Sequence, residues 1–247
     1  MMSKSDFFRF ERKNDDFPFY SELQSPTPTL NLKTSLIFLI AVAAGFALFL
    51  IGFGGTYGHP FINVIFPLAA VIFVARSQWT LLFRKLVAKD IILILGTYIV
   101  NLIVTYGVGF IITKLFNFSA NPVSEGFNGN FSDTITTFLT MLPMLFGEEL
   151  ITILPFLVIL YLGVKKLKLN RKSAIILAWI VVSIIFGAYH LPTYNWNIAQ
   201  AILGIGIVRI VLLYPYIKTK NIWTSFIVHV LNDWTLFGFA FMVSMHH

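Results

Sequence analysis

The sequence contains no cysteine among its 247 residues, and only 12% of the residues are charged. The absence of cysteine excludes disulfide bonds, thiolate metal ligands and a cysteine nucleophile. Soluble domains usually carry about 25% charged residues, so the low charge content excludes an ordinary soluble protein. Hydrophobic residues instead make up 57% of the chain, with 26 Phe, and the mean hydropathy is +0.80. The sequence therefore predicts an integral membrane protein that has the lipid bilayer as its surroundings.

Seven apolar segments approach or exceed the length of about 20 residues that a membrane-crossing helix needs. They cover residues 34–54, 60–77, 90–113, 134–163, 173–191, 198–217 and 221–243. The fold class predicted is all-α, a polytopic transmembrane helix bundle over residues 34–247. Pro143 and Pro155 lie inside the fourth segment, and proline breaks or kinks helices. We therefore expect the fourth segment to be broken, with a re-entrant or interfacial piece at 133–146 and a new helix from about Gly147.

The positive charges predict the orientation of the chain. Residues 1–33 are polar and mixed in charge, and we expect a cytoplasmic tail whose Phe-rich patches lie on the membrane surface. The loops after the second, fourth and sixth segments are basic, whereas the first and fifth loops contain no Lys or Arg. Basic loops stay in the cytoplasm, so the pattern predicts a multi-pass protein of a cell membrane, taken to be a bacterial plasma membrane, with a cytoplasmic N-terminus. These loops also account for the net charge of +7, which therefore indicates no nucleic-acid partner.

Few ionisable residues lie deep inside the predicted spans, and such residues usually face the bundle interior and mark functional sites. They are Glu148, Glu149, His190, Arg209, His229 and Asp233. The two glutamates are adjacent in "LFGEELITILPF", so on a helix they point about 100° apart. Two neighbouring carboxylates in a low dielectric do not easily ionise together, which makes one of them a candidate general base. The alternative is a glutamate paired with a cation to fix helix packing.

The histidines lie in two short motifs. His190 ends the fifth segment in "FGAYHLP", with Phe186 one turn earlier on the same face. His229 and Asp233 are spaced i, i+4 in "HVLND", with Asn232 on a different face. A carboxylate at this spacing can orient the imidazole or supply a metal ligand. The alternatives are a histidine with a purely structural role and a local helix hydrogen bond. By position in their segments, His190 lies near the outer end and His229 about eight residues from the cytoplasmic end.

Arg209 lies about two turns before the cytoplasmic end of the sixth segment. We expect its side chain to extend along the helix to the membrane interface, as long basic side chains near helix ends do. The alternative is that it neutralises one of the glutamates.

Three protease chemistries lack their motifs. The sequence contains no His-Glu-x-x-His and no Gly-x-Ser-x-Gly, and Asp233 is the only Asp deep inside a predicted span. One or two glutamates, two histidines and Asp233 remain, on three helices. This set can hold and deprotonate a water molecule and stabilise an oxyanion, which requires no cofactor. Glu148, His190 and His229 could equally bind a divalent metal ion such as zinc with an open fourth position.

Read in order, the motifs Glu-Glu, Phe-x-x-x-His and His-x-x-x-Asn/Asp resemble those of the CAAX-protease and bacteriocin-processing (CPBP, or Abi) family of intramembrane endopeptidases. The resemblance covers roughly residues 133–240, with the motifs within 145–235. It implies that Glu148 activates the attacking water, that His190 helps to hold this water, and that Glu149 has a supporting role. It also implies that His229 and Asp233 stabilise the oxyanion.

One position departs from the family pattern. The first motif usually reads Glu-Glu-x-x-x-Arg, but its sixth position here is Ile153. The cation that would balance a glutamate is therefore missing from this helix.

The resemblance implies a glutamate-dependent endopeptidase that hydrolyses a peptide bond in a small peptide or a membrane protein. Small bacterial members of the family are linked to bacteriocin self-immunity or to the processing of peptide pheromones. One alternative is a non-catalytic membrane immunity protein that binds a bacteriocin or its receptor. Another is a proton- or ion-coupled carrier, which is disfavoured because the sequence shows no internal repeat.

Overall fold

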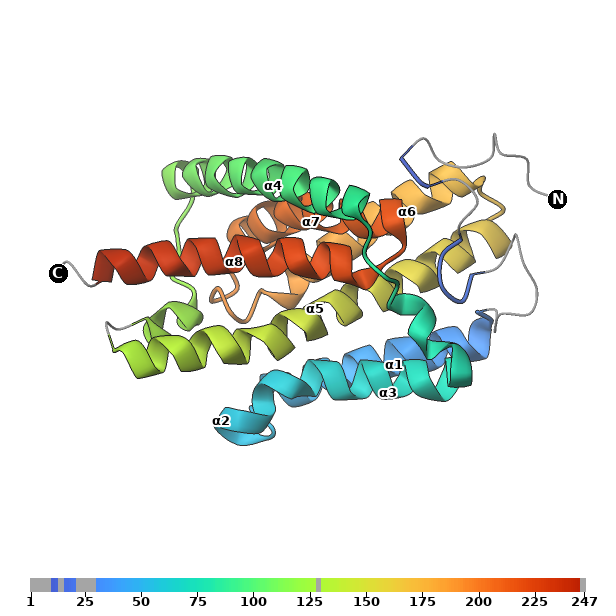
Figure 1. Ribbon diagram of the computed structural model, residues 1–247, viewed down its shortest axis with the longest axis horizontal. Helices are drawn as coiled ribbons and strands as arrows, with labels where there is room; N and C mark the ends of the chain where they lie inside the picture. Colours follow the sequence, from blue (N-terminus) through green and yellow to red (C-terminus); the bar gives the residue numbers. More distant parts are fainter. Residues whose placement is uncertain (1–9, 13–15, 21–29, 128–129, 245–247) are drawn as a thin grey trace.

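The computed structural model describes residues 10–12, 16–20, 30–127 and 130–244, and every regular element in these ranges is helical, which confirms the all-α prediction. The remaining residues of the predicted tail lie outside the described ranges. Six helical stretches in the described part are long and apolar enough to cross a membrane, and α8 takes the place of the seventh predicted segment. The elements (Figure 1) are α1 (Leu32–Leu50), α2 (Gly55–Gly58), η2 (His59–Phe61), α3 (Ile62–Ala75), η3 (Arg76–Leu82), α4 (Ala88–Leu115), η4 (Pro122–Gly126), α5 (Phe131–Lys165), α6 (Arg171–Tyr189), η5 (Ala199–Ile205), α7 (Gly206–Thr219) and α8 (Ile222–Ser244).

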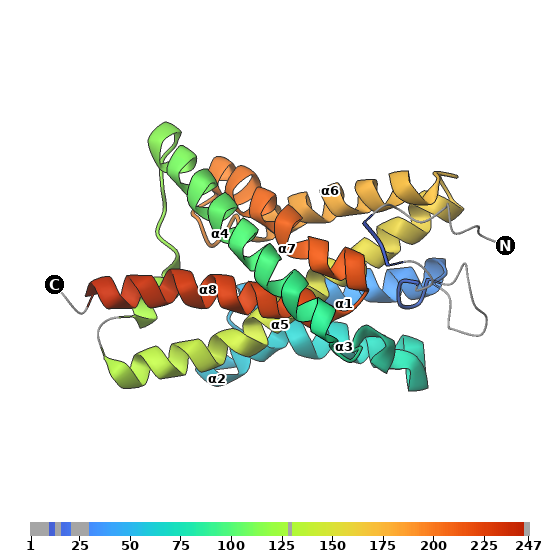
Figure 2. The same cartoon turned by 45° about the horizontal axis from the view of Figure 1, so that its top comes forward.

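Helix α5 is continuous over 35 residues, so the predicted break near Gly147 and the re-entrant piece at 133–146 are wrong. Pro143 and Pro155 lie within it. Proline is tolerated in membrane helices because neighbouring helices and small local adjustments compensate for the lost backbone hydrogen bond. At 1.5 Å per residue, α5 is roughly 52 Å long. It runs along the long axis of the molecule, in contact with α3, α6 and α8 (Figures 1 and 2), so its middle forms the centre of the bundle.

Two glycines let neighbouring helices approach closely at this level. A Cβ atom at Gly147 of α5 would lie 2.7 Å from the Cβ atom of Asn63 on α3. A Cβ atom at Gly187 of α6 would lie 2.6 Å from the carbonyl oxygen of Ala201 in η5. The turn η5 is π-helical, a conformation that is frequent beside functional sites. These contacts fix the positions of α5 and α6 at the level of their predicted site residues.

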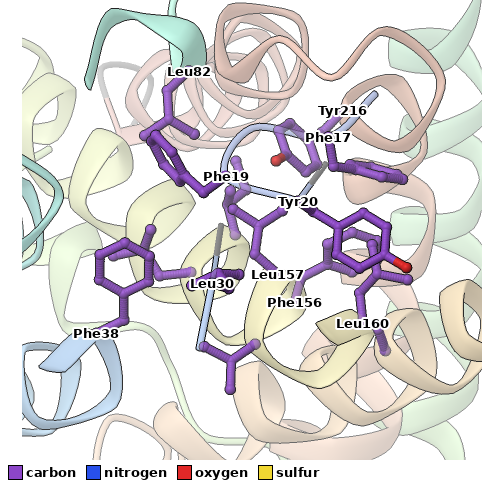
Figure 3. Close-up of a cluster of buried hydrophobic side chains, with 14 of the residues drawn as sticks. Phe17, Phe19, Tyr20, Leu30, Phe38, Leu82, Phe156, Leu157, Leu160 and Tyr216 are labelled. Carbon is purple, nitrogen blue, oxygen red and sulfur yellow. The ribbon is translucent and has the colours of Figure 1, made fainter. Parts of the chain in front are cut away.

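The described part of the N-terminal segment lies inside the protein. Phe17, Phe19 and Tyr20 are at most 3% exposed. The ring of Phe17 lies 5.3 Å from the ring of Phe156 and 6.1 Å from that of Tyr216, and Figure 3 shows these aromatic side chains in one cluster. The prediction that the Phe-rich patches of the tail lie on the membrane surface is therefore wrong for these residues.

A buried ionic network holds the same segment in place. The carboxylate of Glu11 accepts hydrogen bonds from the Arg171 guanidinium at 3.0 and 2.7 Å, and the Nζ atom of Lys220 lies 3.3 Å from it. All three residues are at most 6% exposed. Arg12 forms a further ion pair with Asp90 of α4. The N-terminal segment thus covers the end of the bundle at which α4, α6 and α8 begin, which we call the basic end.

Glu11→Ala is expected to lower the free energy of unfolding by about 3–5 kcal/mol, because it leaves the buried cations Arg171 and Lys220 without this carboxylate. The thermal unfolding midpoint of the purified protein measures the effect. Lys172→Ala, at an exposed neighbouring position, is the control and should change the midpoint little. Equal midpoints for the two variants would contradict a stabilising role of the network.

Candidate active site

A cavity of about 130 Å³ lies among α5, α6, α7 and α8. Glu148, His190, His229 and Asp233 line it. Glu149 lies next to it, with its side chain fully buried. The structure thus brings all five predicted site residues to one place, from three helices that are far apart in sequence.

The carboxylate of Glu148 lies between two imidazole rings. Its Oε1 atom is 4.0 Å from Nε2 of His190, and its Oε2 atom is 3.6 Å from Nε2 of His229. Both distances exceed a direct hydrogen bond, and a polar gap of this width suits a bridging water molecule. Glu148 can therefore accept a proton from a water that one of the two histidines helps to hold.

His190 is oriented by the end of its own helix. Its Nδ1 atom lies 2.9 Å from the carbonyl oxygen of Phe186, one of the carbonyls that a helix end leaves without an intrahelical partner. A carbonyl oxygen only accepts hydrogen bonds, so Nδ1 carries the proton and Nε2 presents its lone pair toward Glu148. The spacing Phe-x-x-x-His therefore has a local cause, because residue i+4 reaches the carbonyl of residue i.

His229 is oriented by Glu149. Its Nδ1 atom lies 2.9 Å from Oε1 of Glu149, and this carboxylate accepts the hydrogen bond. The Nε2 atom then faces Glu148, and it lies 3.9 Å from Oδ2 of Asp233. The arrangement resembles the way in which the aspartate of a Ser-His-Asp triad fixes the ring of its histidine.

Arg209 of α7 is fully buried, so the prediction that it extends to the membrane interface is wrong. Its Nη1 atom donates a hydrogen bond of 2.6 Å to Oε1 of Glu149, and its guanidinium carbon lies 4.4 Å from the centroid of the Phe186 ring. The structure instead shows the alternative arrangement, in which Arg209 pairs with a glutamate, here Glu149. Arg209 supplies the cation that is missing at Ile153, one helical turn after Glu149. In the sequence, the only sign of this role is that an arginine lies inside an apolar segment.

Asp233 is held by a chain of amides that the sequence analysis missed. Asn232 donates a hydrogen bond of 2.9 Å to Oδ1 of Asp233. Asn101 of α4, which is fully buried, donates one of 2.9 Å to Oδ1 of Asn232. Asn232 was expected on a different helix face from His229 and Asp233, but it lines the same cavity as they do. Helix α4 therefore takes part in positioning Asp233.

Two residues from connecting segments complete the cavity wall. They are Asn121 and Tyr194, and the Nδ2 atom of Asn121 donates a hydrogen bond of 3.1 Å to the Tyr194 hydroxyl. Burial raises the pKa of Tyr194 to about 12, so its hydroxyl stays protonated and can donate a hydrogen bond to a developing oxyanion. Neither residue lies in a periodic segment, which is why no sequence pattern identified them.

Glu148, His190 and His229 are of the types that bind zinc, and His190 and His229 each have their Nδ1 atom engaged by an acceptor, as metal ligands often do. Within the described ranges, however, no three His, Asp or Glu side chains are placed so that they could hold a metal ion.

Residues 130–235 match the model of a family described as type II CAAX prenyl endopeptidase Rce1-like. The matched segment includes α5, α6, α7 and most of α8, and with them all five predicted site residues. This match is consistent with the resemblance drawn from the three motifs. No curated protein and no solved structure matches the chain.

Proposed function

Because residues 130–235 match the model of the Rce1-like family of CAAX proteases, we propose that this membrane protein is an intramembrane glutamate-dependent endopeptidase. One observation supports this most directly. The carboxylate of Glu148 lies in a buried cavity with Nε2 of His190 on one side and Nε2 of His229 on the other.

The proposed reaction begins with a water molecule held between Glu148 and the Nε2 lone pair of His190. Glu148 accepts one proton as the water oxygen bonds to the substrate carbonyl carbon, whose own oxygen becomes an oxyanion. The proton then moves from Glu148 to the amide nitrogen as the carbon–nitrogen bond breaks. The products are an amine and a carboxylic acid, so atoms and charge balance.

Two groups are suited to stabilise the oxyanion. The first is Nε2 of His229, which faces the cavity beside Glu148 and can donate a hydrogen bond when it is protonated. The second is the hydroxyl group of Tyr194, which lines the same cavity. Positioned donors of this kind typically lower the barrier by a few kcal/mol. Asp233 lies 3.9 Å from the same Nε2 atom of His229.

The substrate that we propose is a small peptide or a membrane-protein segment, in bacteriocin self-immunity or in peptide-signal processing. The proposal places the basic end in the cytoplasm of a bacterial cell, because this end carries the basic loops and such loops usually stay in the cytoplasm. It rests on the family resemblance and on the charge pattern.

Purified protein in lipid vesicles, incubated with a library of apolar peptides in ¹⁸O-labelled water, tests the activity. Cleavage should place ¹⁸O in the new carboxylate, which mass spectrometry detects. Cleavage that stops after chelation and returns with zinc would indicate a metal-dependent mechanism instead. Absence of cleavage across the library, in a protein that protects cells against a bacteriocin, would favour the non-catalytic immunity protein.

A further inference from the structure

A second, larger cavity adjoins the catalytic one. It has a volume of about 730 Å³ and lies between the C-terminal half of α4 and the turn η5. Its walls are mostly apolar, with Val108, Phe110, Ile112 and Phe118 among them. Figures 1 and 2 show α4 and α8 diverging toward the end of the molecule that lies away from the basic end. We call this cavity the α4–η5 groove.

The α4–η5 groove borders the catalytic cavity. Six residues line both: Thr105, Asn121, Tyr194, Ile205, Val208 and Leu236. The catalytic cavity has a volume of only about 130 Å³, which is too small for a peptide segment, since pockets even for drug-sized molecules have about 300–1,000 Å³. A substrate whose scissile bond reaches Glu148 therefore needs the adjoining groove for its neighbouring residues.

The N-terminal segment covers the basic end, through Phe17 and the Glu11 network. A third cavity of about 540 Å³ lies between α4 and α7 beside Trp179, nearer the basic end, but it shares no lining residue with the catalytic cavity. We call it the Trp179 groove.

We propose that the α4–η5 groove binds an extended apolar segment of the substrate peptide, next to the bond that is cleaved. The segment enters sideways from the bilayer, in the half of the membrane away from the basic end. The groove offers apolar walls to the substrate side chains, while polar groups lie where it meets the catalytic cavity, at Asn121, Tyr194 and Thr105. This inference rests on the proposed peptidase function, because it assumes that a scissile bond lies beside Glu148.

Glycines in the two grooves allow the same substitution to be compared in the α4–η5 groove and in the Trp179 groove. A Cβ atom at Gly109 or Gly204, both in the α4–η5 groove, would have no atom within 4 Å, and the same holds for Gly96 in the Trp179 groove. Gly109→Trp and Gly204→Trp should fill the α4–η5 groove and raise KM for a peptide with a Leu/Val run by about tenfold or more, with kcat changed less. Gly96→Trp should leave both constants unchanged. Equal KM values in all three variants would overturn the proposal.

A binding measurement separates this proposal from the proposed function. Because the chain has no cysteine, Gly204→Cys can carry a single environment-sensitive fluorophore in the Glu148→Gln background. The Leu/Val peptide should change the fluorescence, even if no cleavage is ever found. A response that follows only the lipid composition would show that a lipid chain fills the groove. A response that follows only the protein concentration would show a second copy of the chain, and either result would overturn the proposal.

Discussion

Replacing Glu148 by Gln is expected to lower kcat for peptide cleavage by about 10²–10⁴-fold, the usual contribution of a general base. Gln has nearly the same shape but cannot accept the proton of the attacking water. The loss should appear in kcat, because the substrate contacts along the α4–η5 groove remain. The measurement is the rate of peptide cleavage by purified protein in lipid vesicles.

Asp133→Asn is the control for this experiment, since it makes the same type of change at an exposed position in the first turn of the same helix. It should leave kcat unchanged. The Glu148→Gln protein should unfold at a temperature close to that of the wild type, which would show that the loss is chemical. Cleavage by Glu148→Gln at the wild-type rate would refute the proposed role of this carboxylate.

Replacing Arg209 by Met is expected to destabilise the protein by about 3–5 kcal/mol, because it leaves the carboxylate of Glu149 buried without its cation. Within the described residues, Oε2 of Glu149 and Nε and Nη2 of Arg209 are buried without a hydrogen-bond partner, while Oε1 of Glu149 is also bonded to Nδ1 of His229. The thermal unfolding midpoint and the yield of folded protein measure the loss.

The double variant Arg209→Met, Glu149→Gln removes both charges and should recover most of the lost stability. It should not recover activity, because a neutral amide does not fix the His229 ring as a carboxylate does, and kcat should stay lower by at least about 10²-fold. Recovery of both properties would show that the pair serves packing alone.

A relocated charge provides a further comparison. Ile153 lies one turn after Glu149 on the same face of α5, so Arg209→Met combined with Ile153→Arg places a cation within reach of the same carboxylate. This variant should be more stable than Arg209→Met alone. If it is equally unstable, the position of Arg209 on α7 matters as much as its charge.

The helical class and the approximate places of the helices follow from the sequence, because apolar runs of this length leave no other way to satisfy the backbone in a bilayer. The break expected in α5 shows where this reasoning stops. Each of Pro143 and Pro155 removes a backbone hydrogen bond from the helix, which destabilises it locally. Packing of α5 against α3, α6 and α8 outweighs this loss. A sequence pattern does not reveal that packing.

The N-terminal segment shows a second limit. Its polar, mixed-charge composition predicts a tail with patches on the membrane surface, yet Glu11 pairs with both Arg171 and Lys220 in a buried network. The three residues lie far apart in sequence. A charge pattern along the chain therefore does not predict that they meet.

The candidate site, too, is only partly predictable from the sequence. The sequence by itself determined which helices carry the candidate site residues, because an ionisable side chain inside an apolar segment is costly and is therefore retained only for a reason. It also determined the local geometry of the Phe-x-x-x-His motif, which depends on residues within one helical turn.

Only the tertiary structure decided which side chains become partners. The pairing of Arg209 with Glu149, the amide chain from Asn101 to Asp233 and the meeting of His190 with His229 each join different helices or reach across several of them. Counting residues from the predicted segment ends placed the two histidines at different depths, yet both line one cavity. Figure 1 shows that α8 begins nearer the middle of the molecule than α6 does. Such relations depend on how the helices are offset along their axes. That offset is set by packing between the helices, for example at Gly147 and Gly187, and is therefore not contained in the periodicity of any single segment.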